Sequence, residues 1–468
     1  MGGDTLLDRG AAVIAGLVQA GEVSPVEVIE ATLERVDRVN PKLNAIVTLN
    51  PRALDDARAL ESRLAKGEDV GPLAGVPVGI KDVTPVAGLR TTYGSPLYKD
   101  HVPAEDALVV RRLRDAGAII LGKTNTPEFA AGGNTWNDVF GRTRNPWNPA
   151  LSAGGSTGGG AASLATGMIA LAEGTDLGGS LRIPASFCGV VGLRPSPGLV
   201  PTHPSDWVWD TLQVTGPMAR TAEDVALMLQ AVAGPSEYAP LAQPAAGRDF
   251  VAAVRGGPKN GLRLAYCPDI AGIGVDPDVE AACRRAAREL VQLGATVDEI
   301  DLDVSFGRDA FLALRGEWFV AWMYDKLDRI DGFGVNVRNN TNAGLTGDPR
   351  ALGAAHLARG RIWHSMRELF RSYDHLLTPT MCVPPFPVEQ NYPETVAGKQ
   401  MKTYVDWLAP TFLLSLTGLP VASVPCGLDP GRMPVGLQVV GRPGDEEGVL
   451  ALAGTVQQLH PIGLPEVG

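Results

Sequence analysis

The chain has 468 residues, 45% of them hydrophobic and 20% charged, which is the composition of an ordinary globular protein. Its formal net charge is −11 and it has no basic stripe, so nucleic acid and anionic membrane surfaces are not expected as its main partners. No stretch reaches the ~20 uninterrupted apolar residues of a membrane-spanning helix, and the N-terminus lacks the basic region of a signal peptide.

Helices and apolar strands are expected to alternate along the chain. In the first half we predict helices over 7–20, 25–39, 104–116 and 156–167, and strands over 76–80, 118–122 and 168–173. Ser24-Pro25 is a favourable start for the second of these helices, with a capping side chain followed by proline in the first turn. In the second half we predict helices over 221–232, 277–293, 308–326, 350–371 and 446–459, and strands over 262–266, 295–300, 375–380, 421–427 and 435–441.

This alternation, with near-continuous apolar strands, predicts an α/β fold. We expect a single large domain built on a central, mixed, mostly parallel, twisted β-sheet that is covered by helices on both faces. No repeat or low-complexity linker divides the chain. The polar, Gly- and Asn-rich piece 332–347 lies between two predicted helices, and we expect a loop there that could act as a lid.

The cysteines and histidines indicate neither a disulfide framework nor a metal site. The five cysteines are far apart and include no CxxC pair, which favours buried free thiols in a reducing compartment and predicts a cytoplasmic protein. The six histidines form no HExxH motif and no paired metal spacing, so we expect no metal. A Ser-His-Asp triad has only scattered support.

Three polar residues in unusual contexts are candidates for chemistry. Ser180 follows Gly178-Gly179, where bare backbone can turn N–H groups toward a substrate oxygen. Ser156 lies in the run 154–160, which has five glycines but lacks the lysine of a phosphate-binding P-loop. Lys81 ends an apolar strand, where burial would lower its pKa and make it a usable base. A tight glycine turn and a surface lysine are the structural alternatives, but together the three residues would supply nucleophile, relay and base without a histidine.

These residues belong to a longer pattern that resembles the amidase signature family. The central match is GGSTGGGAASLATGMIALAEGTDLGGSLRIPASFCGVVGLRP (154–195). Flanking matches are AGVPVGIKDV (74–83), LGKTNTPEFA (121–130), TRNPWNP (143–149), and GLPVASVPCG with PVGLQVVGRP (418–427 and 434–443). The resemblance covers nearly the whole chain and implies one amidase domain over 1–468, with a signature core at about 74–200.

The resemblance implies a role for each of these residues. Ser180 would be the nucleophile and Lys81 the base. Ser156, 24 residues before Ser180, would be the bridging serine, joined to Gly155 by a cis peptide bond. The oxyanion hole would consist of the backbone N–H groups of Leu177, Gly178, Gly179 and Ser180. Polar residues that support the loop would be Thr157, Thr175, Asp176 and Arg182.

The implied reaction is hydrolysis of the amide-type C–N bond of a small molecule through an acyl-enzyme on Ser180, without a cofactor. The substrate could be an aryl or acyl amide, an ester or a carbamate, and the enzyme a monomer or a homodimer. One alternative is the A subunit of a tRNA-dependent amidotransferase, which releases ammonia to a partner protein. Another is a non-catalytic family member.

Two segments are candidates for binding the substrate. One is the glycine-rich loop 131–137, with Gly132, Gly133 and Asn134. The other is 205–212, where Trp207 and Trp209 would point to the same side of an extended segment and could line a pocket for an apolar or aromatic group. A structural aromatic pair on the surface or in the core is the alternative interpretation.

Overall fold

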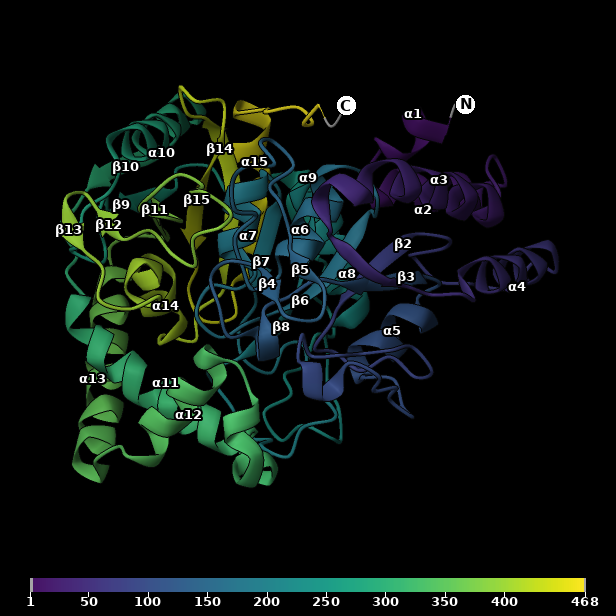
Figure 1. The fold of residues 1–468 in the computed structure, drawn as a ribbon. Coiled ribbons are helices and arrows are strands. Elements are labelled where there is room, and N and C mark those ends of the chain that lie inside the picture. Colours follow the sequence, from purple (N-terminus) through teal and green to yellow (C-terminus); the bar gives the residue numbers. More distant parts are fainter. Residues whose placement is uncertain (1–2, 467–468) are drawn as a thin grey trace.

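The computed structural model describes residues 3–466, which fold around one large β-sheet (Figure 1). Within these residues the main sheet has eleven strands. Their order across the sheet is β1 (Ile46–Leu49), β3 (Ile119–Thr124), β2 (Pro77–Lys81), β6 (Leu171–Asp176), β8 (Val214–Ala219), β7 (Val191–Arg194), β14 (Val421–Leu428), β15 (Pro434–Val440), β11 (His375–Pro379), β9 (Arg263–Tyr266) and β10 (Thr296–Glu299). Two small two-stranded sheets pair β4 (Trp136–Asn137) with β5 (Gly141–Arg142), and β12 (Thr395–Val396) with β13 (Lys399–Gln400).

The predicted mixed sheet is present, but it contains fewer parallel pairs than expected. Among the described residues, four neighbouring pairs of the main sheet are parallel. Six are antiparallel. The parallel pairs form two blocks, β3-β2-β6 and β11-β9-β10, on either side of an antiparallel centre. The short connection between β14 and β15 explains part of the difference, because strands joined by a tight turn pair antiparallel.

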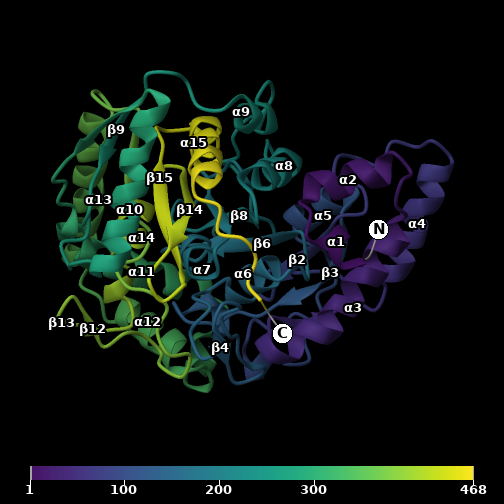
Figure 2. The same ribbon diagram turned by 90° about the horizontal axis from the view of Figure 1, so that it is seen from above.

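Helices cover both faces of the sheet (Figure 2). They are α1 (Gly3–Leu7), α2 (Ala11–Gln19), α3 (Pro25–Leu43), α4 (Ala53–Ala65), α5 (Leu108–Asp115), α6 (Gly158–Ala165), α7 (Arg182–Cys188), α8 (Ala222–Val232), α9 (Phe250–Gly256), α10 (Pro277–Glu289), α11 (Arg308–Trp322), α12 (Val335–Leu345), α13 (Pro349–Leu369), α14 (Ala409–Ser415) and α15 (Glu446–Leu459). Helices α1–α4 lie at one end of the molecule and α11–α13 at the other, in both views.

Alternate residues of single strands bury themselves in different hydrophobic clusters. On β11, Leu376 packs with the cluster under α11 and α13, whereas Leu377 packs with the cluster under α10 and α15. On β14, Val421 and Ala422 divide in the same way. Successive side chains of a strand point to opposite faces, so this division confirms that both faces of the sheet are covered. None of the helices within residues 3–466 combines the length and hydrophobicity needed to cross a bilayer.

Local sequence signals located several elements correctly. Ser24 caps α3 in a capping box with Glu27, and Thr221 caps α8 through the Asp224 N–H.

The loop predicted over 332–347 is wrong, because most of this segment forms the helix α12. Gly344 of α12 packs against Gly316 of α11 so closely that a Cβ on Gly344 would lie 2.2 Å from the Gly316 oxygen. Two helices can approach this closely only through glycine, so tertiary packing outweighs the low helix propensity of the segment.

Candidate active site

Lys81 and Ser156 are joined by a hydrogen bond in the interior of the protein. Lys81 ends β2, Ser156 lies just before α6, and neither side chain is exposed. Lys81 Nζ donates to Ser156 Oγ at 2.7 Å, to Thr175 Oγ1 at 3.0 Å and to the Thr175 carbonyl at 3.4 Å. Burial lowers the pKa of Lys81 to about 7, although the charges of Glu173 and Asp176 oppose the shift. This lysine can therefore be neutral near pH 7 and accept a proton from a hydroxyl.

Ser156 is held between two glycine-rich backbones. The Gly155–Ser156 peptide bond is cis, as the resemblance implies. A Cβ on Gly155 would lie 2.9 Å from the Gly132 oxygen, so only glycine fits where the two loops touch. Thr135 binds both sides of the serine: its Oγ1 donates to the Gly154 carbonyl at 2.8 Å and accepts from the Gly158 N–H at 3.1 Å. Thr135 lies in the predicted loop 131–137 but could not be singled out from the sequence, because a lone threonine carries no pattern.

Ser180 lies in the loop between β6 and α7, where it is half-buried. The Thr157 N–H donates to the Ser180 carbonyl at 3.2 Å, which brings the two serine segments side by side. Among residues 3–466, the Ser180 hydroxyl has no hydrogen-bond partner in the structure, so the predicted relay is joined at Lys81 and Ser156 only. Gly179 has a φ of +126°, and a Cβ there would lie 2.2 Å from Thr411 Oγ1. The loop therefore requires glycine at 179.

Asp176 holds the Ser180 loop through five donors. Its Oδ1 accepts from the Gly179 N–H at 2.8 Å, Arg182 Nη2 at 3.0 Å and Arg194 Nη1 at 3.3 Å. Its Oδ2 accepts from the Leu181 N–H at 3.2 Å and Arg182 Nε at 3.0 Å. The three charged side chains are fully buried. Burial alone would raise the pKa of Asp176, but the two guanidinium charges outweigh it and hold the pKa well below its usual range.

The oxyanion-hole prediction needs a correction at Gly179. Its N–H already donates to Asp176 and so belongs to the support of the loop. The N–H groups of Leu177, Gly178 and Ser180 remain as candidate donors to a substrate oxygen. Thr175 and Arg182 contact the site as expected, whereas the buried hydroxyl of Thr157 has no partner among the described residues. The contact of Thr157 with the site is therefore the hydrogen bond from its N–H to the Ser180 carbonyl.

A family model described as Amidase matches residues 27–450. The chain belongs to the amidase family. Over 96% of its length it is 38% identical to an acylamidase from Rhodococcus erythropolis, 94% of which is covered. It is 36% identical over 94% of its length to the A subunit of the glutamyl-tRNA(Gln) amidotransferase of Carboxydothermus hydrogenoformans, with 95% of that protein covered. Among solved structures, a bacterial aryl acylamidase of the amidase signature enzymes superposes with a TM-score of 0.91 at 29% identity, over 97% of this chain and 96% of that one. The protein is thus an amide-hydrolysing enzyme.

A cavity of about 680 Å³ in this amidase reaches Thr175, the residue that contacts Lys81. Aromatic side chains line it, and Trp207 is among them, as predicted. Trp209 does not line it and is 65% exposed, so that part of the prediction is wrong. Val208 and Trp209 lie in a turn that the Asp210 N–H closes by donating to the Trp207 carbonyl at 3.3 Å, so the alternation of an extended strand does not apply here. Trp318 and Trp322 of α11 supply the other indole rings.

The predicted loop residues Gly132, Gly133 and Asn134 lie beside Ser156 and not in this cavity. Gly133 packs against Trp407, and a Cβ on it would lie 2.7 Å from the indole ring. Asn134 Nδ2 donates to the carbonyls of Val388 and Gln390 at 3.0 and 2.7 Å. In this structure these residues hold the Ser156 loop in place.

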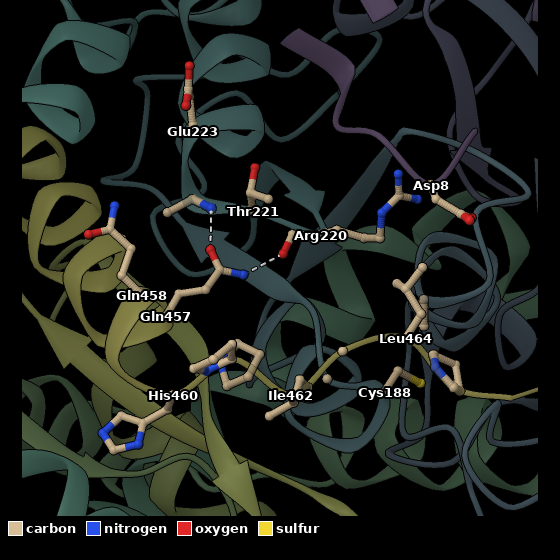
Figure 3. A pocket seen from close by; sticks show the side chains of 18 of the residues that line it. Asp8, Cys188, Arg220, Thr221, Glu223, Gln457, Gln458, His460, Ile462 and Leu464 are labelled. Carbon is tan, nitrogen blue, oxygen red and sulfur yellow. Dashed lines mark hydrogen bonds between the residues drawn. The ribbon is translucent and has the colours of Figure 1, made fainter. Parts of the chain in front are cut away.

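A second cavity of this amidase, of about 470 Å³, lies under the C-terminal segment 460–465 (Figure 3). Lys81, Ser156 and Ser180 are among the lining residues of neither cavity, but the first one reaches Thr175, which contacts Lys81. Gln457 spans one wall: its Nε2 donates to the Arg220 carbonyl at 2.6 Å and its Oε1 accepts from the Ala222 N–H at 3.1 Å. Cys188 reaches the opposite wall, and burial raises the pKa of its thiol. These groups are engaged in structure, so we assign the cavity no part in catalysis.

Proposed function

We propose that Ser180 is the nucleophile of amide hydrolysis, with Ser156 as the proton relay and Lys81 as the base. The observation that carries this proposal is the 2.7 Å hydrogen bond between Lys81 Nζ and Ser156 Oγ, both completely buried beside the Ser180 loop. A lysine next to a buried hydroxyl and a glycine-rich turn is suited to activating a serine without histidine. No metal is required for these steps.

In the proposed mechanism, neutral Lys81 accepts a proton from Ser156, which in turn accepts the proton of Ser180. Ser180 Oγ then forms a bond to the substrate carbonyl carbon, and the carbonyl π electrons move to its oxygen. The N–H groups of Leu177, Gly178 and Ser180 would hold that oxyanion, and the loss of one such donor raises the barrier by ~3 kcal/mol. Collapse breaks the C–N bond, and the proton returns through Ser156 to the leaving amine. Water releases the acyl group by the same route.

The aromatic cavity supports the proposal that the substrate carries an aryl group on one side of the scissile bond. Trp207, Trp318 and Trp322 offer flat apolar surface close to Thr175. The names of the acylamidase and aryl acylamidase relatives agree with such a substrate. We propose small aryl amides as substrates, with aryl esters and carbamates as additional ones, since the same acyl-enzyme would form from each.

The test is active-site labelling combined with turnover of a p-nitroanilide. A fluorophosphonate probe should modify Ser180 in the wild-type protein, located by mass spectrometry of the peptide. S180A should lose both labelling and hydrolysis, whereas S163A, which changes a buried serine that donates to the Gly159 carbonyl in α6, should keep both. Labelling of another residue, or hydrolysis by folded S180A, would show that Ser180 is not the nucleophile.

A glutaminase role within a tRNA-dependent amidotransferase is the alternative that the 36% identity keeps open. A glutaminase activity that requires a partner protein would support it, and hydrolysis of aryl amides by the purified chain alone would count against it. We further propose a cytoplasmic location and a monomer or homodimer. The five cysteines, all free and buried, support the reducing compartment.

A further inference from the structure

A second lysine is buried beside the proposed base but takes no part in the proposed proton relay. Lys123 lies on β3, the strand next to β2, and its side chain is fully buried. Its Nζ donates to the Thr84 carbonyl, and to Thr91 Oγ1 at 3.2 Å. A buried ammonium is costly unless it is paired with negative charge, so the surroundings of Lys123 should contain a counter-charge.

Two buried carboxylates supply that charge, Asp82 with the larger attraction and Glu173 on β6 with the smaller, and Glu173 also contacts the base. Its side chain is fully buried. Its Oε2 accepts from the backbone N–H of Lys81 at 3.1 Å, and its Oε1 accepts from Thr84 Oγ1 at 2.9 Å. Thr84 therefore links the two charged groups, because its hydroxyl binds Glu173 and its carbonyl binds Lys123.

Strand register fixes this arrangement around the base. Ile80, the residue before Lys81, pairs with Lys123 on β3 and with Glu173 on β6. The two opposite charges thus flank the end of the strand that carries Lys81. Near Lys81 the other charged group is Asp176 on β6, whose charge is offset by Arg182 and Arg194. Near Lys123 the other charged groups are Asp106 and Asp82, and Arg90 lies close to Asp82.

We propose that Lys123 and Glu173 are positioning residues for the base. Glu173 holds the end of β2 through the Lys81 N–H, and the positive charge of Lys123 offsets Glu173, so that Lys81 stays neutral while the enzyme works. Without Lys123, Lys81 would be the cation nearest to Glu173 and would retain its proton. This inference rests on the proposed role of Lys81 as base.

Glu173 acts on both lysines. Burial lowers the pKa of Lys81 to about 7 and that of Lys123 to about 8, in each case against the attraction of Glu173 and other nearby carboxylates. A proton on Lys123 therefore offsets part of the attraction that Glu173 exerts on a proton on Lys81.

The experiment is the pH profile of kcat/KM for a p-nitroanilide, measured on full-length variants. The acid limb reports protonation of the base in the free enzyme. K123M should move this limb to higher pH by on the order of one unit, because the positive charge that offsets Glu173 is lost. E173Q should move it in the opposite direction, because an attracting charge is lost. The double variant should return close to the wild type, and K123R, which keeps the charge, should leave the limb in place.

A milder variant guards against misfolding of K123M. T91V removes the hydroxyl that accepts from Lys123 and so favours the neutral form of that lysine. It should move the acid limb in the same direction as K123M by a smaller amount. An acid limb that stays at the wild-type pH in folded T91V, K123M and E173Q, or moves in one direction in all three, would overturn the inference. Full activity of K81A would instead refute the base itself, so the two failures are distinguishable.

Discussion

Replacing Asp176 by asparagine tests whether one buried carboxylate holds the Ser180 loop. The substitution keeps the shape of the side chain but removes its charge, leaving Arg182 and Arg194 buried without an anion. An amide has a single acceptor oxygen. If it faces the three donors on the Oδ1 side, its NH2 group faces the Leu181 N–H and Arg182 Nε. Breaking a buried ion pair in this way costs ~3–5 kcal/mol in the free energy of unfolding.

The same substitution should also reduce catalysis, because a neutral amide holds the Gly179 N–H less firmly than the carboxylate does and the adjacent candidate oxyanion donors move with it. A displaced donor costs about 10²–10³-fold in kcat. Urea unfolding followed by circular dichroism measures the first effect, and p-nitroanilide hydrolysis at saturating substrate measures the second. D224N is the matched control: Asp224 is equally buried but caps the start of α2 by accepting from the Ala12 N–H, and it should leave kcat unchanged. Wild-type kcat and wild-type stability in D176N would refute the reasoning.

Two further predictions concern the substrate and the working pH. W207A should raise KM for aryl amides by up to about 10-fold, since an aromatic contact is worth ~0.5–1.5 kcal/mol and ~1.4 kcal/mol is tenfold in affinity. W209A, with its ring 65% exposed, should leave KM unchanged. Equal effects of the two substitutions would show that the cavity does not bind the aryl group. The acid limb of kcat/KM in the wild type should lie near pH 7, because Lys81 is neutral only above its pKa of about 7; a limb near pH 10 would mean that the base titrates as an ordinary exposed lysine.

The residues of the proposed triad could be located from the sequence because each stands in a local pattern. An apolar run ending in a lysine predicted the end of β2, and the glycines around Ser156 and Ser180 predicted close backbone contacts. These signals are short in sequence and need no knowledge of the distant chain. The hydrogen bond between Lys81 and Ser156 adds that the two segments meet in space.

Features that depend on contacts between distant segments could not be predicted in this way. Helix α12 forms from a Gly- and Asn-rich segment because Gly344 meets Gly316 on a neighbouring helix. The two tryptophans of 205–212 diverge because the segment turns. The N–H of Gly179 is taken by a carboxylate three residues earlier, which depends on the conformation of the loop and not on residue types.

The buried charges on either side of Lys81 are also invisible in a single sequence. Lys123 and Glu173 are 50 positions apart, and each lies inside an apolar strand. A single charged residue there interrupts the apolar pattern but does not indicate a partner. Their relation becomes apparent once the register places both next to Ile80.

The anchoring of Arg182 has a consequence for when this enzyme becomes active during its synthesis. Arg182 lies two residues after Ser180, the proposed nucleophile, yet its guanidinium donates to the Thr411 carbonyl at 2.9 Å, to Ser415 Oγ at 2.7 Å and to Gln438 Oε1 at 2.8 Å. Chains emerge from the ribosome N-terminus first, so all three proposed catalytic residues are translated long before these acceptors. The loop gains its last supports only when residue 438 has been added. A nascent chain that stops short of it would carry a complete triad in its sequence and no assembled site.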